Sequence, residues 1–192
     1  MLVFRNPKTQ LPMDAPVSQE YPNGLIMIDE DSASMQDGRL FMFEVPLTIT
    51  AGATEEVLLI TPTAEYGLTE LRNVQVMSYQ DTGISMIKVE LIEGVTTATT
   101  DGNTTVFNCN RTDLRTANVQ VHSDPATISG GVALPMTMMT VRSSTLISEI
   151  SMRGDKPPIR LQESYKYSIK LTNTDASNSA TVILNVMFIE SV

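Results

Sequence analysis

The sequence predicts an all-β protein, an antiparallel β-sandwich of jelly-roll-like type with an extended N-terminal arm. Three observations lead to this prediction. Apolar and polar residues alternate with a period of two in several segments. Turn signals separate these segments at roughly 8 to 20 residues, and no stretch keeps a helical apolar stripe over three turns. We expect about eight to ten strands, and eight strands in two sheets is the jelly-roll number.

The first 38 residues differ from the rest, and we expect residues 1–38 to form the arm and residues 39–192 the sandwich domain. Proline lacks a backbone N–H and fixes φ, so a proline-rich segment rarely forms a central strand or a helix. Residues 25–28 could pair briefly at a sheet edge. The prolines of the arm are Pro7, Pro12, Pro16 and Pro22.

Residues 40–50 begin the alternating pattern, with apolar residues at the odd positions, and Pro46 suggests an edge strand or a bulge there. The clearest alternation covers residues 165–172. Its inward positions are expected to be Tyr165, Tyr167, Ile169 and Leu171, and its water-facing positions Lys166, Ser168, Lys170 and Thr172.

Other segments lack this alternation. Residues 57–60 and 182–189 are apolar on both faces, which predicts central strands or an interface. Short helical turns could form over residues 63–71 and 145–152.

Charge and composition exclude several classes of protein. The 192 residues include 13 basic and 22 acidic ones, a net charge of −9. Because phosphate backbones are bound by clustered Lys and Arg, which this chain lacks, we expect no nucleic-acid partner. No stretch approaches the roughly 18 apolar residues of a membrane span, so no membrane partner is expected. A single cysteine permits no intrachain disulfide, which fits synthesis in a cytoplasm.

Catalytic and metal-binding patterns are weak. His122, the only histidine, is expected on a solvated strand face, and Cys109 is interpreted as a small buried apolar residue. Glu55 and Glu56 are expected to be solvated. The acidic run 29–31 could hold Ca²⁺ but lacks the EF-hand alternation. We therefore predict a protein that is not an enzyme, with no catalytic residue, cofactor or metal.

Apolar residues outside the expected core predict contact surfaces. A strand that is apolar on both faces, such as residues 134–141, can bury only one face in its own sandwich. The other face then meets another subunit or a partner. The expected oligomer or partner interface comprises Leu2, Phe4, Leu25, Met27, Met136, Met138 and Met139.

Four segments together resemble tailed-bacteriophage virion structural proteins, among them small β-sandwich head proteins of the decoration or cement type. The segments are residues 37–62, 87–94 (IKVELIEG), 107–112 (FNCNRT) and 167–173 with the final strand. The Asn-x-Asn-Arg piece is the most specific of them. Physically, Asn108 and Asn110 can cap a turn through their side chains and Arg111 can bridge neighbouring carbonyls, so this piece is interpreted as a structural turn.

The resemblance implies a capsid decoration protein that binds between capsomers and stabilises the head. Its implied partner is the major capsid protein, its assembly a homotrimer at three-fold positions, and its location the capsid surface of the virion. Synthesis would take place in the host cytoplasm. Two alternatives stay open: a receptor-binding or fibre-associated, carbohydrate-binding jelly-roll module, and a neck or tail-completion protein. The scarcity of aromatic residues disfavours a sugar site.

Overall fold

The computed structural model describes residues 4–5, 12–13, 30–63, 67–78, 85–97, 100–125, 128–142, 148–151 and 158–191. Side chains are described for residues 31–63, 67–77, 86–96, 100–125, 128–134 and 158–191. Contacts divide the chain after Ala33 into an N-terminal unit and a sandwich unit of residues 34–192. In the N-terminal unit, β1 (Phe4–Arg5) pairs antiparallel with β2 (Pro12–Met13).

Helix α1 (Glu30–Gln36) lies inside the segment expected to be extended, so that expectation is wrong for these residues. The last proline of the arm is Pro22, and acidic residues in the first turn complement the helix dipole. Gly38 ends the helix with a φ of 65°. There the Gly38 N–H donates to the Met35 carbonyl (3.0 Å) and the Arg39 N–H to the Ser34 carbonyl (2.8 Å), a glycine-terminated cap.

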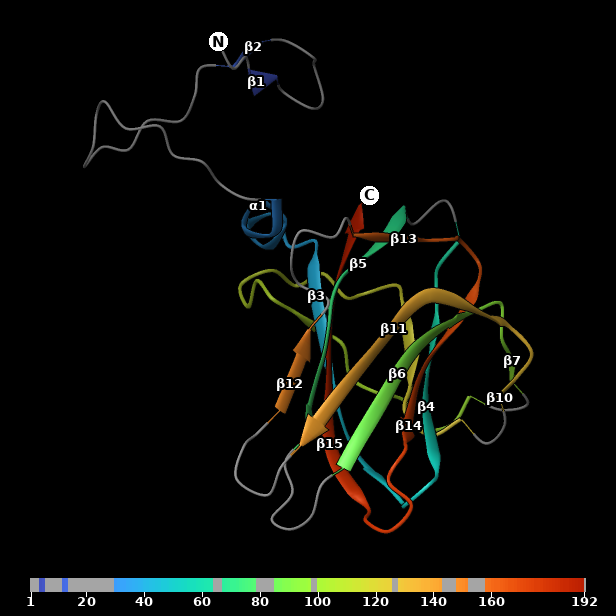
Figure 1. Cartoon of the computed structure of the whole chain (residues 1–192). Helices are drawn as coiled ribbons and strands as arrows, with labels where there is room; N and C mark the ends of the chain where they lie inside the picture. Colours follow the sequence, from blue (N-terminus) through green and yellow to red (C-terminus); the bar gives the residue numbers. More distant parts are fainter. Residues whose placement is uncertain are drawn as a thin grey trace. The chain divides into compact units, whose positions relative to one another are not determined.

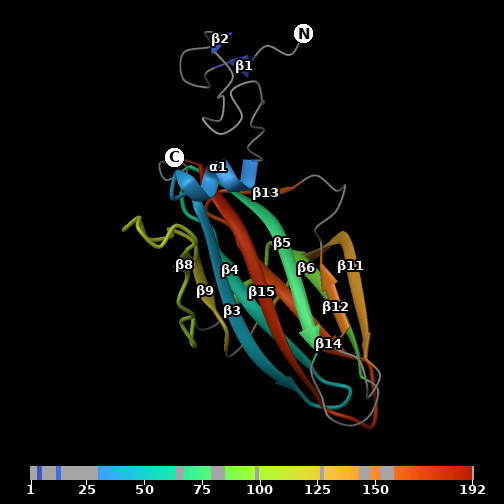
Figure 2. The same ribbon diagram turned by 90° about the vertical axis from the view of Figure 1, so that its left-hand side faces the viewer.

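The sandwich consists of two antiparallel sheets. The first has the order β11-β6-β14-β4-β9 and the second β12-β5-β15-β3-β8, with β13 also paired to β5. Figure 1 shows the strands of the first sheet on the right and those of the second on the left, and Figure 2 shows β3, β15 and β5 side by side in the second. The bounds are β3 (Leu40–Ile49), β4 (Thr54–Ile60), β5 (Leu68–Ser78), β6 (Ser85–Glu93), β8 (Phe107–Asn108), β9 (Gln120–His122), β11 (Val132–Arg142), β12 (Ser148–Ser151), β13 (Ile159–Leu161), β14 (Lys166–Asn173) and β15 (Ala180–Ser191).

Eight of these strands follow the jelly-roll order. β4, β14, β6 and β11 are neighbours in the first sheet, and β3, β15, β5 and β12 are neighbours in the second. All but one of the connections between consecutive strands of this set cross from one sheet to the other. The structure therefore confirms the prediction of an all-β, jelly-roll-like sandwich.

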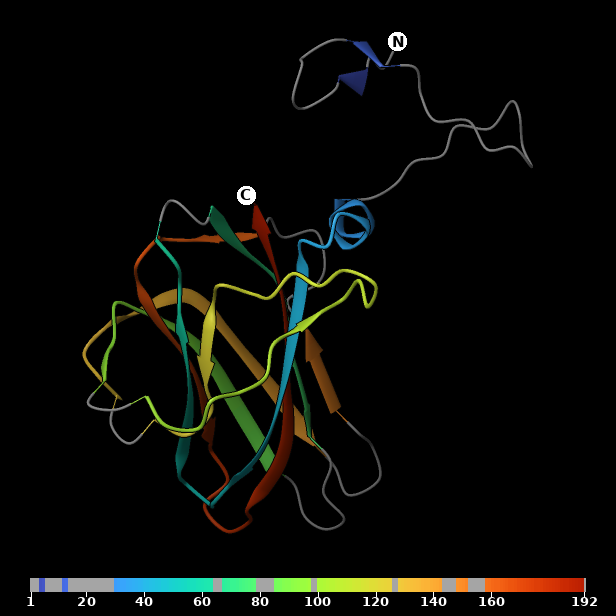
Figure 3. The same cartoon turned by 180° about the vertical axis from the view of Figure 1, so that it is seen from behind.

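The exception is the connection from β6 to β11, residues 94–131, which we call the insertion. It carries β7 (Thr96–Thr97) and β10 (Ile128–Ser129), which pair with each other. It also supplies β9, which pairs with β4, and β8, which pairs with β3. The insertion thereby extends both sheets on the same side of the sandwich (Figure 3).

The core lies between the sheets and is apolar. Phe188 on β15 stacks on Phe41 with ring centroids 5.8 Å apart and contacts Phe43 at 6.5 Å. Tyr167, Ile169 and Leu171 are buried on β14, as their alternation predicts. The apolar runs at residues 57–60 and 182–189 form β4 and β15, and β15 is central in its sheet.

Three sequence expectations are wrong in detail. Tyr165 precedes β14 and is 37% exposed, whereas Ser168, expected to face water, is fully buried. Ser168 is buried on the outer face of β14, where its hydroxyl donates to Glu56 at 2.6 Å. The suggested helical turn over 63–71 is a strand from Leu68, because β5 pairs with β15 along its length.

Candidate functional site

The most distinctive surface of the sandwich is a cleft beside β3, which we call the β3 cleft. Its volume is about 410 Å³. Strand β3 forms the floor, while β4 and the insertion contribute the walls. Its lining residues are Glu44, Val45, Pro46, Leu47, Thr48, Glu55, Thr104, Ser123 and Asp124.

The insertion wall of the β3 cleft is held by backbone contacts. The Ser123 N–H donates to the Gly102 carbonyl at 2.7 Å, and the Thr104 N–H donates to Val121 at 2.9 Å. Gly102 has a φ of 68°, and a Cβ there would lie 2.7 Å from the Asp124 nitrogen. Only glycine allows the backbone at residue 102 to come this close to the backbone of Asp124, so the wall that carries Asp124 has a defined position.

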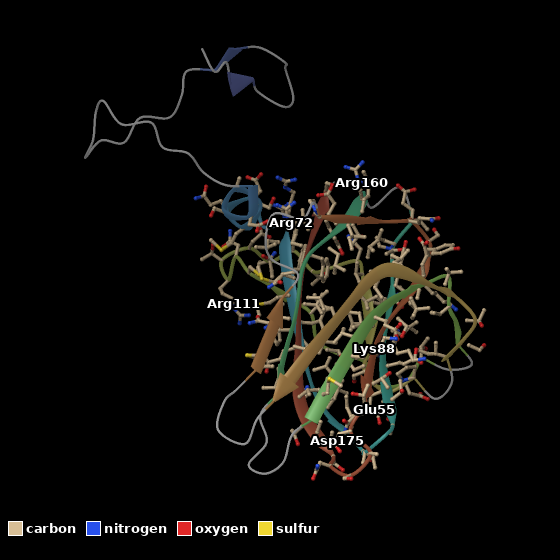
Figure 4. The ribbon with its side chains drawn as sticks, in the orientation of Figure 1. Glu55, Arg72, Lys88, Arg111, Arg160 and Asp175 are labelled. Atoms are coloured by element: carbon tan, nitrogen blue, oxygen red, sulfur yellow. The ribbon has the colours of Figure 1, made fainter. Side chains whose placement is uncertain are left out.

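Three carboxylates line the β3 cleft: Glu44, Glu55 and Asp124. Within the described part of the chain, none of them forms an ion pair or a hydrogen bond through its carboxylate. Figure 4 shows Glu55 in the lower half of the sandwich, with Arg72 and Arg160 near its upper end, and the labelled cation nearest to Glu55 in this view, Lys88, pairs with Glu90 at 2.8 Å. The β3 cleft is therefore an acidic surface without a cationic partner among the described side chains.

The insertion is anchored to β15 by Glu190, a carboxylate that is only 3% exposed. It accepts hydrogen bonds from the Asn118 backbone N–H (2.9 Å), the Asn118 side chain (3.0 Å) and the Val119 N–H (2.8 Å). A carboxylate that accepts several N–H donors is strongly bound. Sequence reasoning missed this residue, whose only signal is a charged residue directly after the apolar run 182–189 and inside β15.

The Asn-x-Asn-Arg piece forms a turn that is tied to the end of α1. Asn108 accepts the Asn110 N–H (2.9 Å) and donates to the Gly38 carbonyl (3.1 Å). Asn110 accepts the Thr112 N–H (3.1 Å) and donates to the Gln36 carbonyl (3.1 Å). Both side chains therefore act locally on the backbone and join the insertion to the start of the sandwich.

Arg111 does not bridge carbonyls but lies over the Phe107 ring, 5.6 Å from its centroid. Phe107 is 44% exposed, and Leu114 in the same loop is 96% exposed. At the end of this loop the Arg115 N–H donates to Asp113 at 2.8 Å. This bond and the Arg115 guanidinium lower the pKa of the Asp113 carboxyl. A loop held by hydrogen bonds thus presents apolar side chains to solvent.

A second cleft, of about 490 Å³, lies beside β9, and its lining has no Asp, Glu, Lys or Arg and includes Thr100, Asn103, Gln120 and His122. The expectation of a solvated His122 is wrong, because its side chain is 4% exposed. His122 pairs with Leu58 on one side and forms a bridge with Asn103 on the other. Neither ring nitrogen of His122 has a hydrogen-bond partner among the described residues. The described side chains therefore include no nucleophile or carboxylate that is hydrogen-bonded to this imidazole, as a catalytic base would require.

Cys109 and Tyr167 have shifted pKa values with structural causes. Partial burial raises the pKa of the Cys109 thiol, and its backbone N–H donates to the Leu40 carbonyl at 2.9 Å. Burial also raises the pKa of Tyr167 to about 12. The Tyr167 hydroxyl accepts the Gln162 N–H (2.7 Å) and donates to Glu93 (3.0 Å), which closes the turn before β14. The hydrogen bonds of both residues therefore stabilise the sandwich.

The predicted interface residues fall largely outside the described side chains. Leu2, Leu25 and Met27 lie outside the described residues, as does the acidic residue Asp29. Phe4 belongs to β1, and Met136, Met138 and Met139 belong to β11, but their side chains are not described. The interface assignment stays a prediction for these residues.

No protein-family model, no curated protein and no solved structure matches the chain. Among the described residues, no group of three or more His, Cys, Asp or Glu side chains is placed to hold a metal ion. None of the helical segments that the structure describes is both long and apolar enough to cross a membrane.

Proposed function

We propose that this protein is a non-enzymatic virion structural protein that decorates a bacteriophage capsid and stabilises the head by binding between capsomers. The observation that carries the proposal is the division of the chain into a jelly-roll sandwich and a separate N-terminal unit. A sandwich supplies a rigid body, and a long proline-rich segment supplies a second point of attachment. The resemblance of most of residues 37–192 to tailed-bacteriophage virion structural proteins agrees with this division.

The mechanism is multivalent attachment. Each copy makes modest contacts with the major capsid protein, and a second contact from the same copy, or from another copy in a homotrimer, becomes intramolecular. The effective concentration of each further contact then lies in the millimolar range for a short flexible linker. Affinity for the assembled shell therefore exceeds affinity for one isolated capsomer.

The arm provides the test of this mechanism. Deletion of residues 1–29 removes the attachment segment but keeps α1, whose last turn bonds to Asn110 and Arg39. We expect binding to purified capsids that lack the protein to weaken by about 100-fold or more, the range by which avidity exceeds a single contact. Thermal unfolding of the truncated chain should change little, because the removed residues lie outside the sandwich unit.

Capsid binding is measured by co-sedimentation, with a matched variant in which residues 1–29 are replaced by a Gly/Ser segment of equal length. That variant should bind as weakly as the truncated chain. Full capsid affinity in either variant would contradict the role of the arm in attachment.

A further inference from the structure

Strand β3 keeps one free edge within the described structure. One side of β3 pairs with β15 along its whole length, from Leu40 to Ile49. On the other side, β8 pairs only with Phe41 and Met42. Beyond Met42 no described residue pairs with that side of β3, and this stretch forms the floor of the β3 cleft.

The chemistry of the β3 cleft selects for an apolar segment that carries positive charge. Pro46 and Leu47 provide apolar floor, and Glu44, Glu55 and Asp124 surround it with three carboxylates. Pro46 also lacks an N–H, which discourages indiscriminate pairing with any other strand edge. Binding at the β3 cleft therefore depends on side chains as well as on backbone hydrogen bonds.

The beginning of the chain has this composition. Residues 2–4 are Leu, Val and Phe, and they are followed by Arg5 and Lys8, the only basic residues among the first 38. Strand β1 is already extended and pairs with β2 on one side. Its second edge has no described partner.

We propose that residues 2–8 of one copy dock in the β3 cleft of a second copy, where Arg5 and Lys8 meet the carboxylates of the rim and Leu2 or Phe4 covers the floor. The contact is a form of strand addition with charge complementarity. This proposal rests on the homo-oligomer of the proposed function and gives it a contact surface.

The chain is long enough for such an exchange. Residues 9–29 between the docking segment and α1 span up to about 70 Å when extended. A domain of this size has a radius of gyration of only about 15 Å. An arm can therefore reach the β3 cleft of a neighbouring subunit, and reciprocal docking closes a symmetric assembly.

Charge reversal in the full-length chain tests the proposal. The variants are Arg5→Glu in the arm and Glu44→Lys in the cleft, studied by sedimentation velocity at low salt and without capsids. We expect self-association of the unmodified chain, and a dissociation constant raised at least about tenfold in each variant, because like charges then face each other. In a trimer formed from a mixture of the two variants, two of the three arm–cleft contacts are complementary, so the mixture should associate more tightly than either variant alone.

Two matched reversals serve as controls: Lys166→Glu on β14 and Glu163→Lys, an exposed residue before β14. Neither should change self-association more than about twofold, the scale of screened surface charges. Circular dichroism checks that all variants are folded.

Four results would overturn the proposal. The first is a monomeric unmodified chain at all accessible concentrations. The second is equal weakening by the control reversals. The third is that self-association recovers in a chain that carries both substitutions but not in the mixture of the two single variants. That result would mean that each arm docks in its own cleft. Loss of capsid binding by Arg5→Glu with unchanged self-association would also overturn the β3 cleft assignment, while the decoration function would stand.

Discussion

Replacing Glu190 with alanine is expected to lower the free energy of unfolding by about 3 kcal/mol, because the substitution leaves buried N–H donors of Asn118 and Val119 without an acceptor. Chemical denaturation in urea measures this change. The insertion should loosen first, because Glu190 connects it to β15. Hydrogen exchange at the Val119 amide reports that local effect.

A comparison with Glu190→Gln and Glu163→Ala makes the result specific. Glutamine keeps one acceptor oxygen, so about half of the loss is expected. Glu163 is exposed, and its replacement should change stability by less than about 0.5 kcal/mol. If Glu190→Ala were as mild as Glu163→Ala, the insertion would not be anchored by this carboxylate.

Replacing Phe188 with alanine is expected to have the other large effect, a loss of about 3 to 5 kcal/mol. The ring is buried between the sheets and contacts Phe41 and Phe43, so its removal leaves a cavity at the centre of the core. A loss of this size is a large part of the stability of a typical domain. Urea denaturation and the yield of folded protein both report it.

The matched control is Phe107→Ala, which removes the same side chain from an exposed position. The expected loss there is below about 1 kcal/mol, mainly the contact with Arg111. Equal losses at the two positions would contradict the placement of β15 at the centre of its sheet.

The alternation of residues predicts the sandwich well where one face of a strand meets the core. It places Ile169 and Leu171 correctly, and the edge character of β3 follows from Pro46. It fails for Ser168 and His122, because a period of two separates the faces of a strand but does not say whether the outer face is covered. Ser168 is covered on the outer face of β14, and His122 lies between β4 and the insertion.

The β3 cleft could not be predicted from the sequence for a related reason. Glu44, Glu55 and Asp124 belong to β3, β4 and the insertion, and only the sheet topology brings them together. Glu44 and Glu55 look like ordinary solvated residues of two strands.

The central claim of this account is that the protein decorates a capsid lattice, and the copy number in purified virions tests it most directly. Quantitative mass spectrometry against the major capsid protein gives this number. We expect a ratio near one to one, or a simple fraction that corresponds to hundreds of copies. A few to a few tens of copies would place the protein at the neck, tail or fibre, and its complete absence from virions would contradict the proposed function.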